Sequence, residues 1–250
     1  RPIRWILTLY GKACVPISIA GLRSSRLTSV GQTAHRRSVL ASSPADYLLL
    51  IRRNGIVLDG LKRRSSIQDL CKCFAKKTLG RPVPELIEHG LLDETSQLVE
   101  HPVAFLGLFE RSYLSLPREV LLASMSKYQR LCAVESNEGY VLPHFVAILN
   151  GRPRAMRSVK ANYERILNAR LADSMLFWER DCALRMEDLD ISGITIHERL
   201  GSMRDKTERL AHLSKALSSA WHLTNEETNQ LYRACLLAKS DLGTRMVREF

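Results

Sequence analysis

The sequence predicts an α+β fold, with a mixed strand and helix part at residues 1–152 and an all-helical part at residues 153–250. The order of the elements carries this prediction, because β-rich runs alternate with helical patterns up to a turn near residue 152 and only helical patterns follow it. The composition supports a globular chain, since 45% of the 250 residues are hydrophobic and 25% are charged. Wholesale disorder, collagen and a transmembrane bundle are therefore excluded.

The first elements follow from turn and capping residues. Gly and Lys at 11–12 predict a turn between strands at 3–10 and 13–20. Ser43 followed by Pro44 is typical of a helix start, since Ser is a favourable N-cap and Pro at the first helical position loses no hydrogen bond.

The following elements have equally local signals. A helix is expected at about 59–79, because Gly80 and the Arg-Pro pair after it prevent continuation. An apolar run at 103–109 predicts a buried strand. A Pro-initiated helix is expected to about residue 128, and a Gly-containing turn at 136–139 predicts a hairpin of 130–136 with 140–149. The later helices are expected at about 155–183, 196–219 and 224–249.

The net charge of +11 points to a polyanionic partner or a basic targeting segment. The first 45 residues contain seven basic side chains and no acidic one. An acid-free, Ser-rich start is typical of an organelle transit peptide. However, the β-branched and aromatic residues at 1–10 favour a basic strand within a fold.

The six cysteines are scattered, and only Cys71 and Cys73 are close together. A Cys-x-Cys pair without a second pair or a nearby His is not a zinc signature, because four ligands must converge on the metal. We therefore expect reduced thiols. No apolar run approaches the roughly 18 residues that span a bilayer. The protein is expected to be soluble and cytoplasmic, with no membrane partner.

The helix expected at 155–183 is the most informative segment. At 100° per residue, one side presents Leu167, Leu171, Ser174 and Trp178, and the other presents Asn162, Arg165, Ile166, Arg170, Asp173 and Phe177. Because the polar side also carries large apolar residues, we expect both sides to be covered. Either Arg170 pairs with Asp173, or Arg165 and Arg170 reach an RNA phosphate.

Positive charge gathers at the start of the same helix, at Arg152, Arg154, Arg157 and Lys160. The positive end of the helix dipole lies there, so a phosphate contact and a solvated loop are both compatible with the pattern.

A metal-dependent phosphohydrolase of the His-Asp (HD) type is an alternative, with His197 and Asp241 as candidate ligands. Such a site needs a tandem His-Asp, and Ser240 stands where the His belongs. We therefore expect no metal site.

Several segments together resemble one family. They include Ser43-Pro-Ala-Asp-Tyr47, Leu98-Val-Glu-His-Pro-Val103, Asn162-Tyr-Glu-Arg-Ile-Leu-Asn-Ala-Arg-Leu-Ala-Asp173 and Glu198-Arg-Leu-Gly-Ser202. Their order and spacing are similar to those of the β subunit of bacterial-type heterotetrameric glycyl-tRNA synthetase. The resemblance runs over essentially the whole chain, which looks like an internal fragment of that subunit.

The resemblance implies a tRNA-binding, non-chemical part of glycine–tRNA ligase, inactive when isolated. It also implies that the helical part runs into a degenerate HD-like domain, in agreement with Ser240. The partners would be tRNA(Gly) and an α subunit in an α2β2 assembly. ATP with Mg²⁺ would bind the α subunit, and this chain would hold no cofactor and no catalytic residue. A synthetase-derived structural RNA-binding module remains a further alternative. The candidate RNA-binding residues are Arg152, Arg154, Lys160, Arg165 and Arg170, with Asn162 and Asp173 as an orienting network.

Overall fold

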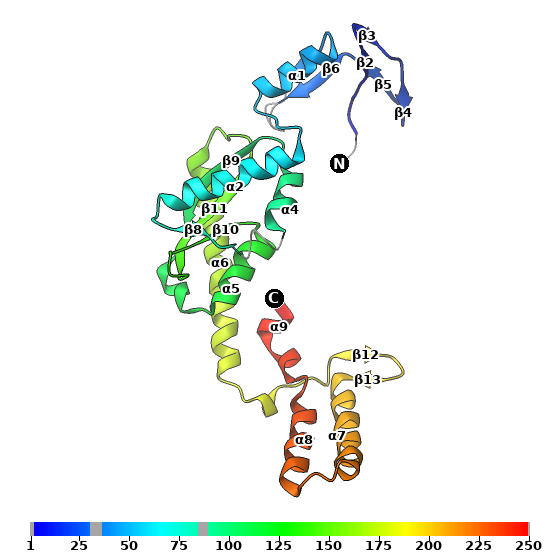
Figure 1. Ribbon diagram of the computed structural model, residues 1–250, viewed down its shortest axis with the longest axis vertical. Helices are drawn as coiled ribbons and strands as arrows, with labels where there is room; N and C mark the ends of the chain where they lie inside the picture. Colours follow the sequence, from blue (N-terminus) through cyan, green and yellow to red (C-terminus); the bar gives the residue numbers. More distant parts are fainter. Residues whose placement is uncertain (1–2, 31–36, 85–89, 250) are drawn as a thin grey trace. The chain divides into compact units, whose positions relative to one another are not determined.

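The computed structural model describes residues 3–30, 37–84 and 90–249 (Figure 1). The chain forms two compact units, Arg1–Asn168 and Ala169–Phe250, which we call unit 1 and unit 2. The fold is mixed, with helices and strands in both units.

Within residues 3–30 and 37–40, unit 1 begins with seven short strands. Leu9–Tyr10 (β2) and Ala13–Cys14 (β3) pair around Gly11, which has φ +56° and confirms the expected turn. Each of the two expected long strands is divided, however. The interruption lies where the Thr8 hydroxyl donates to the carbonyl of Val15, next to Pro16, which has no N–H for a ladder. The other strands are Ile6–Leu7 (β1), Ser18–Ile19 (β4), Leu22–Ser25 (β5), Leu27–Val30 (β6) and Arg37–Leu40 (β7).

Two predicted helix starts are confirmed. Helix α1 (Pro44–Arg53) is capped by Ser43, whose hydroxyl accepts from the main-chain N–H of Asp46. Helix α2 (Gly60–Lys76) is capped by Asp59, whose carboxylate accepts from two main-chain N–H groups of the first turn.

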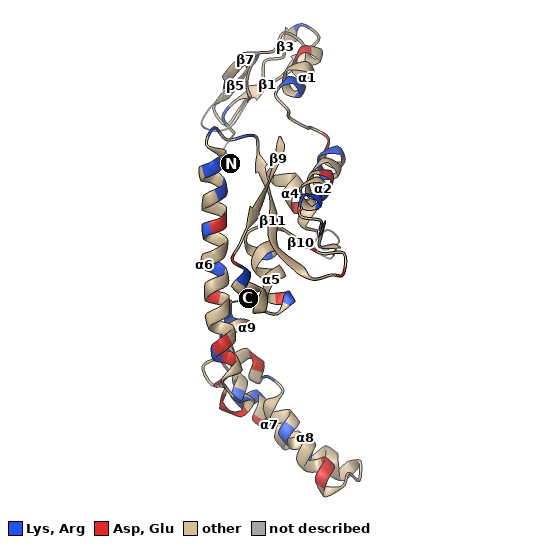
Figure 2. Ribbon diagram, turned by 90° about the vertical axis from the view of Figure 1, so that its left-hand side faces the viewer, with Lys and Arg blue, Asp and Glu red and all other residues tan. Residues whose placement is uncertain are grey.

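A four-stranded antiparallel sheet forms the centre of unit 1, in the order β8-β10-β11-β9. The expected hairpin is confirmed, with Gly139 at φ +90° in its turn. The buried strand expected at 103–109 is also confirmed. Helix α2 covers one face of this sheet and α6 the other (Figure 2). The strands are Arg81–Pro82 (β8), Pro102–Leu108 (β9), Cys132–Glu135 (β10) and Val141–Asn150 (β11).

Shorter helical segments complete unit 1. They are Leu91–Leu98 (α4), Arg111–Ser115 (η2), Arg118–Ala123 (α5) and Ser124–Tyr128 (η3). The helix expected up to residue 128 is confirmed, although its last turn is wound as a π-helix. The core of the sheet contains Phe145, Val134 and Leu131, all at most 1% exposed.

Unit 2 begins within the long helix α6 (Met156–Cys182) and is built around an antiparallel pair of helices, α7 (Met203–Ala220) and α8 (Asn225–Leu237). Both helices begin with a capping box, formed by Ser202 with Asp205 and by Thr224 with Glu227. Three short segments complete the unit, namely Met186–Asp188 (η4), Ser240–Gly243 (η5) and Arg245–Glu249 (α9).

The expectation that residues 153–250 are all-helical is wrong at one place. Thr195–His197 (β12) and Gly201–Ser202 (β13) form a hairpin where the helix at 196–219 was expected to begin. Gly201 has φ +78°, which a helix does not accommodate, and the capping box starts the helix only after Ser202. The helix expected at 224–249 is also interrupted, at η5.

The turn near residue 152 lies where the sequence places it, with Gly151 at φ +81° and α6 starting soon after. The first turns of α6 nevertheless pack on the sheet of unit 1, so the two compact units divide at Asn168 rather than at the turn.

Candidate nucleic-acid interface

The turn that carries Arg152 and Arg154 is fixed by hydrogen bonds to residues 100 and 101. The side-chain oxygen of Asn150 accepts from the main-chain N–H groups of Glu100 and His101, at 3.1 and 3.0 Å. Gly151 donates to the carbonyl of His101 at 2.6 Å. These bonds fix the position from which the two arginines project.

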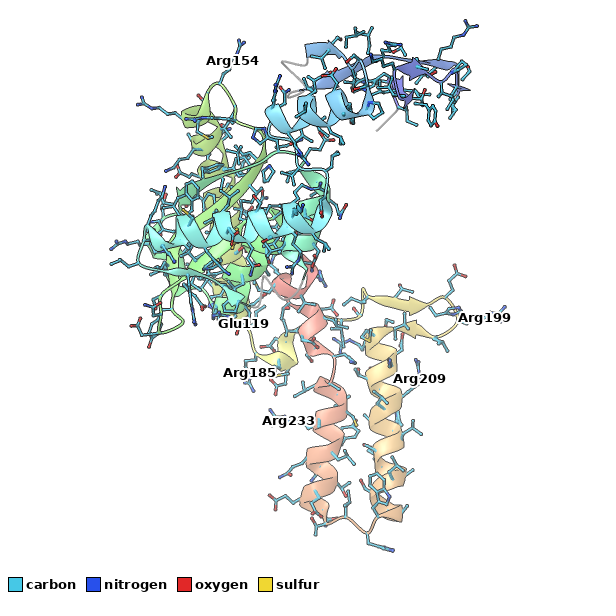
Figure 3. The ribbon with its side chains drawn as sticks, turned by 45° about the horizontal axis from the view of Figure 1, so that its top comes forward. Glu119, Arg154, Arg185, Arg199, Arg209 and Arg233 are labelled. Carbon is cyan, nitrogen blue, oxygen red and sulfur yellow. The ribbon has the colours of Figure 1, made fainter. Side chains whose placement is uncertain are left out.

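Arg152, Arg154 and Arg157 are all exposed, and none forms an ion pair with a described residue. Arg154 points away from the body of unit 1 (Figure 3). Unpaired guanidinium groups at the start of a helix suit phosphate oxygens, because each offers several N–H donors and the helix dipole adds positive potential. The turn and the first turn of α6 therefore form a cationic surface.

The other side of α6 is anchored to the sheet through polar and aromatic contacts. The carboxylate of Glu164 accepts from the N–H of Leu108 at 3.0 Å, and the amide oxygen of Asn168 accepts from the N–H of Glu110 at 2.9 Å. The Tyr163 ring meets Phe105 edge-on, 5.3 Å between ring centroids. These contacts determine which face of the helix remains open.

That open face carries Asn162 and Arg165, which are both exposed. The guanidinium of Arg165 donates to the side-chain oxygen of Asn162 at 3.4 Å. The contact is a long hydrogen bond between neighbouring turns, compatible with the proposed orienting role of Asn162. Ile166 is 48% exposed beside them, so the expectation that this side of α6 is covered is wrong within the described chain.

Lys160 has a neighbour of opposite charge. Its ammonium lies 3.6 Å from the carboxylate of Glu164, the same group that accepts from Leu108. Lys160 is half-buried and compensates a carboxylate needed for anchoring α6. This structural role stands beside its predicted phosphate contact.

Arg170 lies in unit 2, where its guanidinium donates to the main-chain carbonyl of Glu249 at 3.2 Å. Asp173 is exposed, and among the described residues it forms no ion pair with Arg170, so the expected pair is wrong. The structure thus brings Asn162 and Arg165 together, but not Arg170 and Asp173.

Two residues that the sequence did not single out, His144 and Arg111, lie near Lys160. Burial lowers the pKa of His144 below its usual value, and the positive charges of Arg111 and Lys160 lower it further. The three side chains come from β11, η2 and α6, which are far apart in the sequence. No local pattern could have revealed this cluster.

His197 and Asp241, the two candidate HD positions, lie in different elements. His197 is exposed in β12, and its Nδ1 accepts from the N–H of Arg199 at 3.2 Å. Asp241 is exposed in η5. Within residues 3–30, 37–84 and 90–249, no three His, Cys, Asp or Glu side chains converge as a metal site would require. The phosphohydrolase alternative therefore gains no support from the described residues.

The fold and this surface define a class, namely mixed α/β proteins that present a fixed cationic surface suited to a polyanion. Comparison with known sequences identifies the family within this class. A sequence model of the family described as glycyl-tRNA synthetase beta subunit matches residues 1–250, and the chain belongs to this family.

Similar proteins carry the same name. The glycine–tRNA ligase beta subunit of Shouchella clausii is 35% identical over 255 residues, covering all of this chain and 36% of the relative. The corresponding subunits of Synechocystis sp. and Bacillus subtilis are 34% and 33% identical, each again over the whole of this chain. The chain thus spans about a third of the length of these relatives. In the described parts of the chain, no helix is long and apolar enough to cross a membrane.

Proposed function

We propose that this chain supplies a tRNA-gripping surface to glycine–tRNA ligase, as part of its β subunit. The proposed reaction is the ATP-dependent attachment of glycine to tRNA(Gly). The family membership and the exposed, unpaired arginines at 152 and 154 support the proposal. Arg165, oriented by Asn162, adds a third cation on helix α6, which follows that turn.

The mechanism we propose is positional. Arginines that bind phosphates fix the register and orientation of the tRNA, so that its 3′ end enters an active site on another chain. That chain is the α subunit, in an α2β2 assembly in the cytoplasm. ATP and Mg²⁺ bind there, and this chain contributes no cofactor ligand.

Unit 2 has a second, finer assignment in this proposal. We assign its helical core to a degenerate HD-like domain, in which Ser240 replaces the His of the tandem ligand pair. The separate positions of His197 in β12 and Asp241 in η5 support a non-hydrolytic role.

A double substitution, Arg152→Ala with Arg154→Ala, tests the proposal in the complex with the α subunit. We expect the KM for tRNA to rise roughly tenfold, because two phosphate contacts are lost. Glycine activation by ATP should be unchanged, since no reacting group touches this surface. Arg199→Ala with Arg209→Ala, two exposed arginines of unit 2 (Figure 3), is the matched control.

An unchanged KM for tRNA in the unit 1 variant would contradict the proposal. Failure of the chain to co-purify with an α subunit would instead favour a structural RNA-binding module.

A further inference from the structure

Helix α2 and the residues after it carry a second concentration of positive charge in unit 1 (Figure 2). Residues 60–81 contain seven Lys and Arg and a single acid, Asp69. Some of these cations have structural partners. Arg63 donates to main-chain carbonyls, among them that of Ser96, and Arg64 pairs with Asp93. Lys72 and Lys76 are exposed and form no ion pair with a described residue. They lie one turn apart on the same face of the helix.

These two lysines line an open pocket of about 380 Å³. Three segments build it, namely the last turn of α2, the edge strand β8 and the β10–β11 turn. Its lining residues are Lys72, Lys76, Leu79, Gly80, Arg81, Pro82 and Asn137. None of the described lining residues is acidic. The neighbouring Glu138 is engaged with Ser136, and a hydrogen bond from that hydroxyl lowers the pKa of Glu138.

The third cation, Arg81, is held in place from beneath the pocket. Its Nε donates to Oε1 of Glu135 at 2.9 Å, and Arg118 donates to Oε2 at 2.8 Å. Glu135 is only 2% exposed, whereas the Arg81 side chain is 51% exposed. Arg81 is therefore a pre-oriented cation with donors left for solvent or a ligand.

The backbone also has an unusual shape at this pocket. Leu79 has φ +58°, a left-handed conformation that is unfavourable for a branched apolar residue, and its side chain is 88% exposed. A Cβ on Gly80 would lie 2.7 Å from the carbonyl oxygen of Glu135, so this position admits no side chain. An exposed Leu79 side chain thus lies beside three cationic side chains.

We propose that this pocket binds the phosphate and ribose groups of an RNA backbone. Phosphates would contact Lys72, Lys76 and Arg81, and a ribose would lie against Leu79 and Pro82. The volume is at the low end of ligand pockets, which span about 300–1,000 Å³, and suits one or two nucleotides. Cations beside an apolar surface match the alternation of phosphate and sugar along the backbone. The inference rests on the RNA-binding function proposed above but concerns a different surface.

The test compares two pairs of lysines on and next to the same helix. Lys72→Gln with Lys76→Gln removes two charges from the pocket. Lys62→Gln with Lys77→Gln removes two charges outside it, since Lys62 lies in the first turn of α2 and the Lys77 ammonium lies over the Phe74 ring. Affinity for tRNA is measured on the full chain over a range of salt concentrations.

The pocket pair should weaken tRNA binding roughly tenfold and lower the slope of log affinity against log salt by about 2, whereas the control pair should change affinity less than about twofold. Equal losses from both pairs, or no loss from the pocket pair, would overturn the inference.

Two further measurements separate the sources of the ligand chemistry. In the first, free AMP is titrated into the parent protein and into the pocket variant. If the parent binds AMP as tightly as it binds RNA, and the pocket variant does not bind AMP, the ligand is a mononucleotide and the inference of an RNA backbone is overturned. In the second, binding of the pocket variant to the α subunit is measured. Loss of α-subunit binding with RNA binding intact would overturn the inference and indicate that the pocket contacts an acidic protein surface. If Arg152→Ala with Arg154→Ala weakens tRNA binding while the pocket pair does not, only the pocket inference fails. If neither does, the proposed function fails as well.

Discussion

The two units differ sharply in charge. Residues 1–168 contain 25 Lys and Arg against 13 Asp and Glu, whereas residues 169–250 contain 12 against 13. The whole positive excess therefore belongs to unit 1. The ion pairs also differ in burial. Unit 1 has a buried carboxylate between two arginines beside more exposed pairs such as Arg64 with Asp93, whereas the described pairs of unit 2 are exposed, for example Arg233 with Glu187. The excess of positive charge favours unit 1 over unit 2 for contact with a polyanion.

The largest expected effect is on the buried carboxylate of unit 1. Glu135→Gln leaves Arg81 and Arg118 without their shared anion, and we expect a loss of about 2 kcal/mol, modest because both guanidiniums reach solvent. Urea unfolding measures it. The matched change Glu187→Gln breaks an exposed pair of unit 2 and should leave the unfolding midpoint unchanged. Equal losses of stability in the two variants would show that the buried carboxylate of unit 1 contributes no more than the exposed pair of unit 2.

A smaller effect is expected at the start of α7. Ser202→Ala removes the hydroxyl that accepts from the N–H of Asp205, and should destabilise unit 2 by about 1 kcal/mol. Ser219→Ala, at an exposed position later in α7, is the control and should be neutral or slightly stabilising. Hydrogen exchange should show faster opening of α7 in the first variant alone. Faster exchange across the sheet of unit 1 would argue against independent units.

The smallest expected effect is that of pH on the free energy of unfolding, which should change at different pH values in the two units. Burial lowers the pKa of His144, so the folded protein binds fewer protons there than the unfolded chain. Stability should therefore fall as the pH drops below about 6.5, the pKa of an unperturbed His. In unit 2, hydrogen bonds from Ser202 lower the pKa of Asp205, and that contribution is lost only near pH 4 and below.

Unfolding measured between pH 7.5 and 5.5 checks this difference. The parent should lose stability over that range and His144→Gln should lose less. Identical slopes for the two proteins would show that His144 does not contribute.

The sequence predicted what depends on near neighbours. The cap at Ser43, the end of the second helix before Gly80 and the turn at Gly139 were recognisable, because each requires only residues a few positions away. The hairpin at 195–202 was missed because its apolar and charged residues also fit a helical pattern, and because Gly201 lies above the Asp205 carboxylate only once α7 is formed.

The candidate site was predictable in part for the same reason. The basic turn at 150–154 is contiguous in the sequence. By contrast, Glu164 anchors Leu108 and His144 lies near Arg111 and Lys160 across long sequence separations. Contacts of that kind leave no periodic signal, so they could not be predicted.

The central claim is that tRNA contacts the cationic surface of unit 1. The most direct test measures log affinity for tRNA against log salt concentration for the parent, for Arg152→Ala with Arg154→Ala, and for Arg199→Ala with Arg209→Ala. We predict that the slope falls by about 2 in the unit 1 variant and is unchanged in the unit 2 variant. An unchanged slope in the unit 1 variant, or an equal fall in both variants, would contradict the claim.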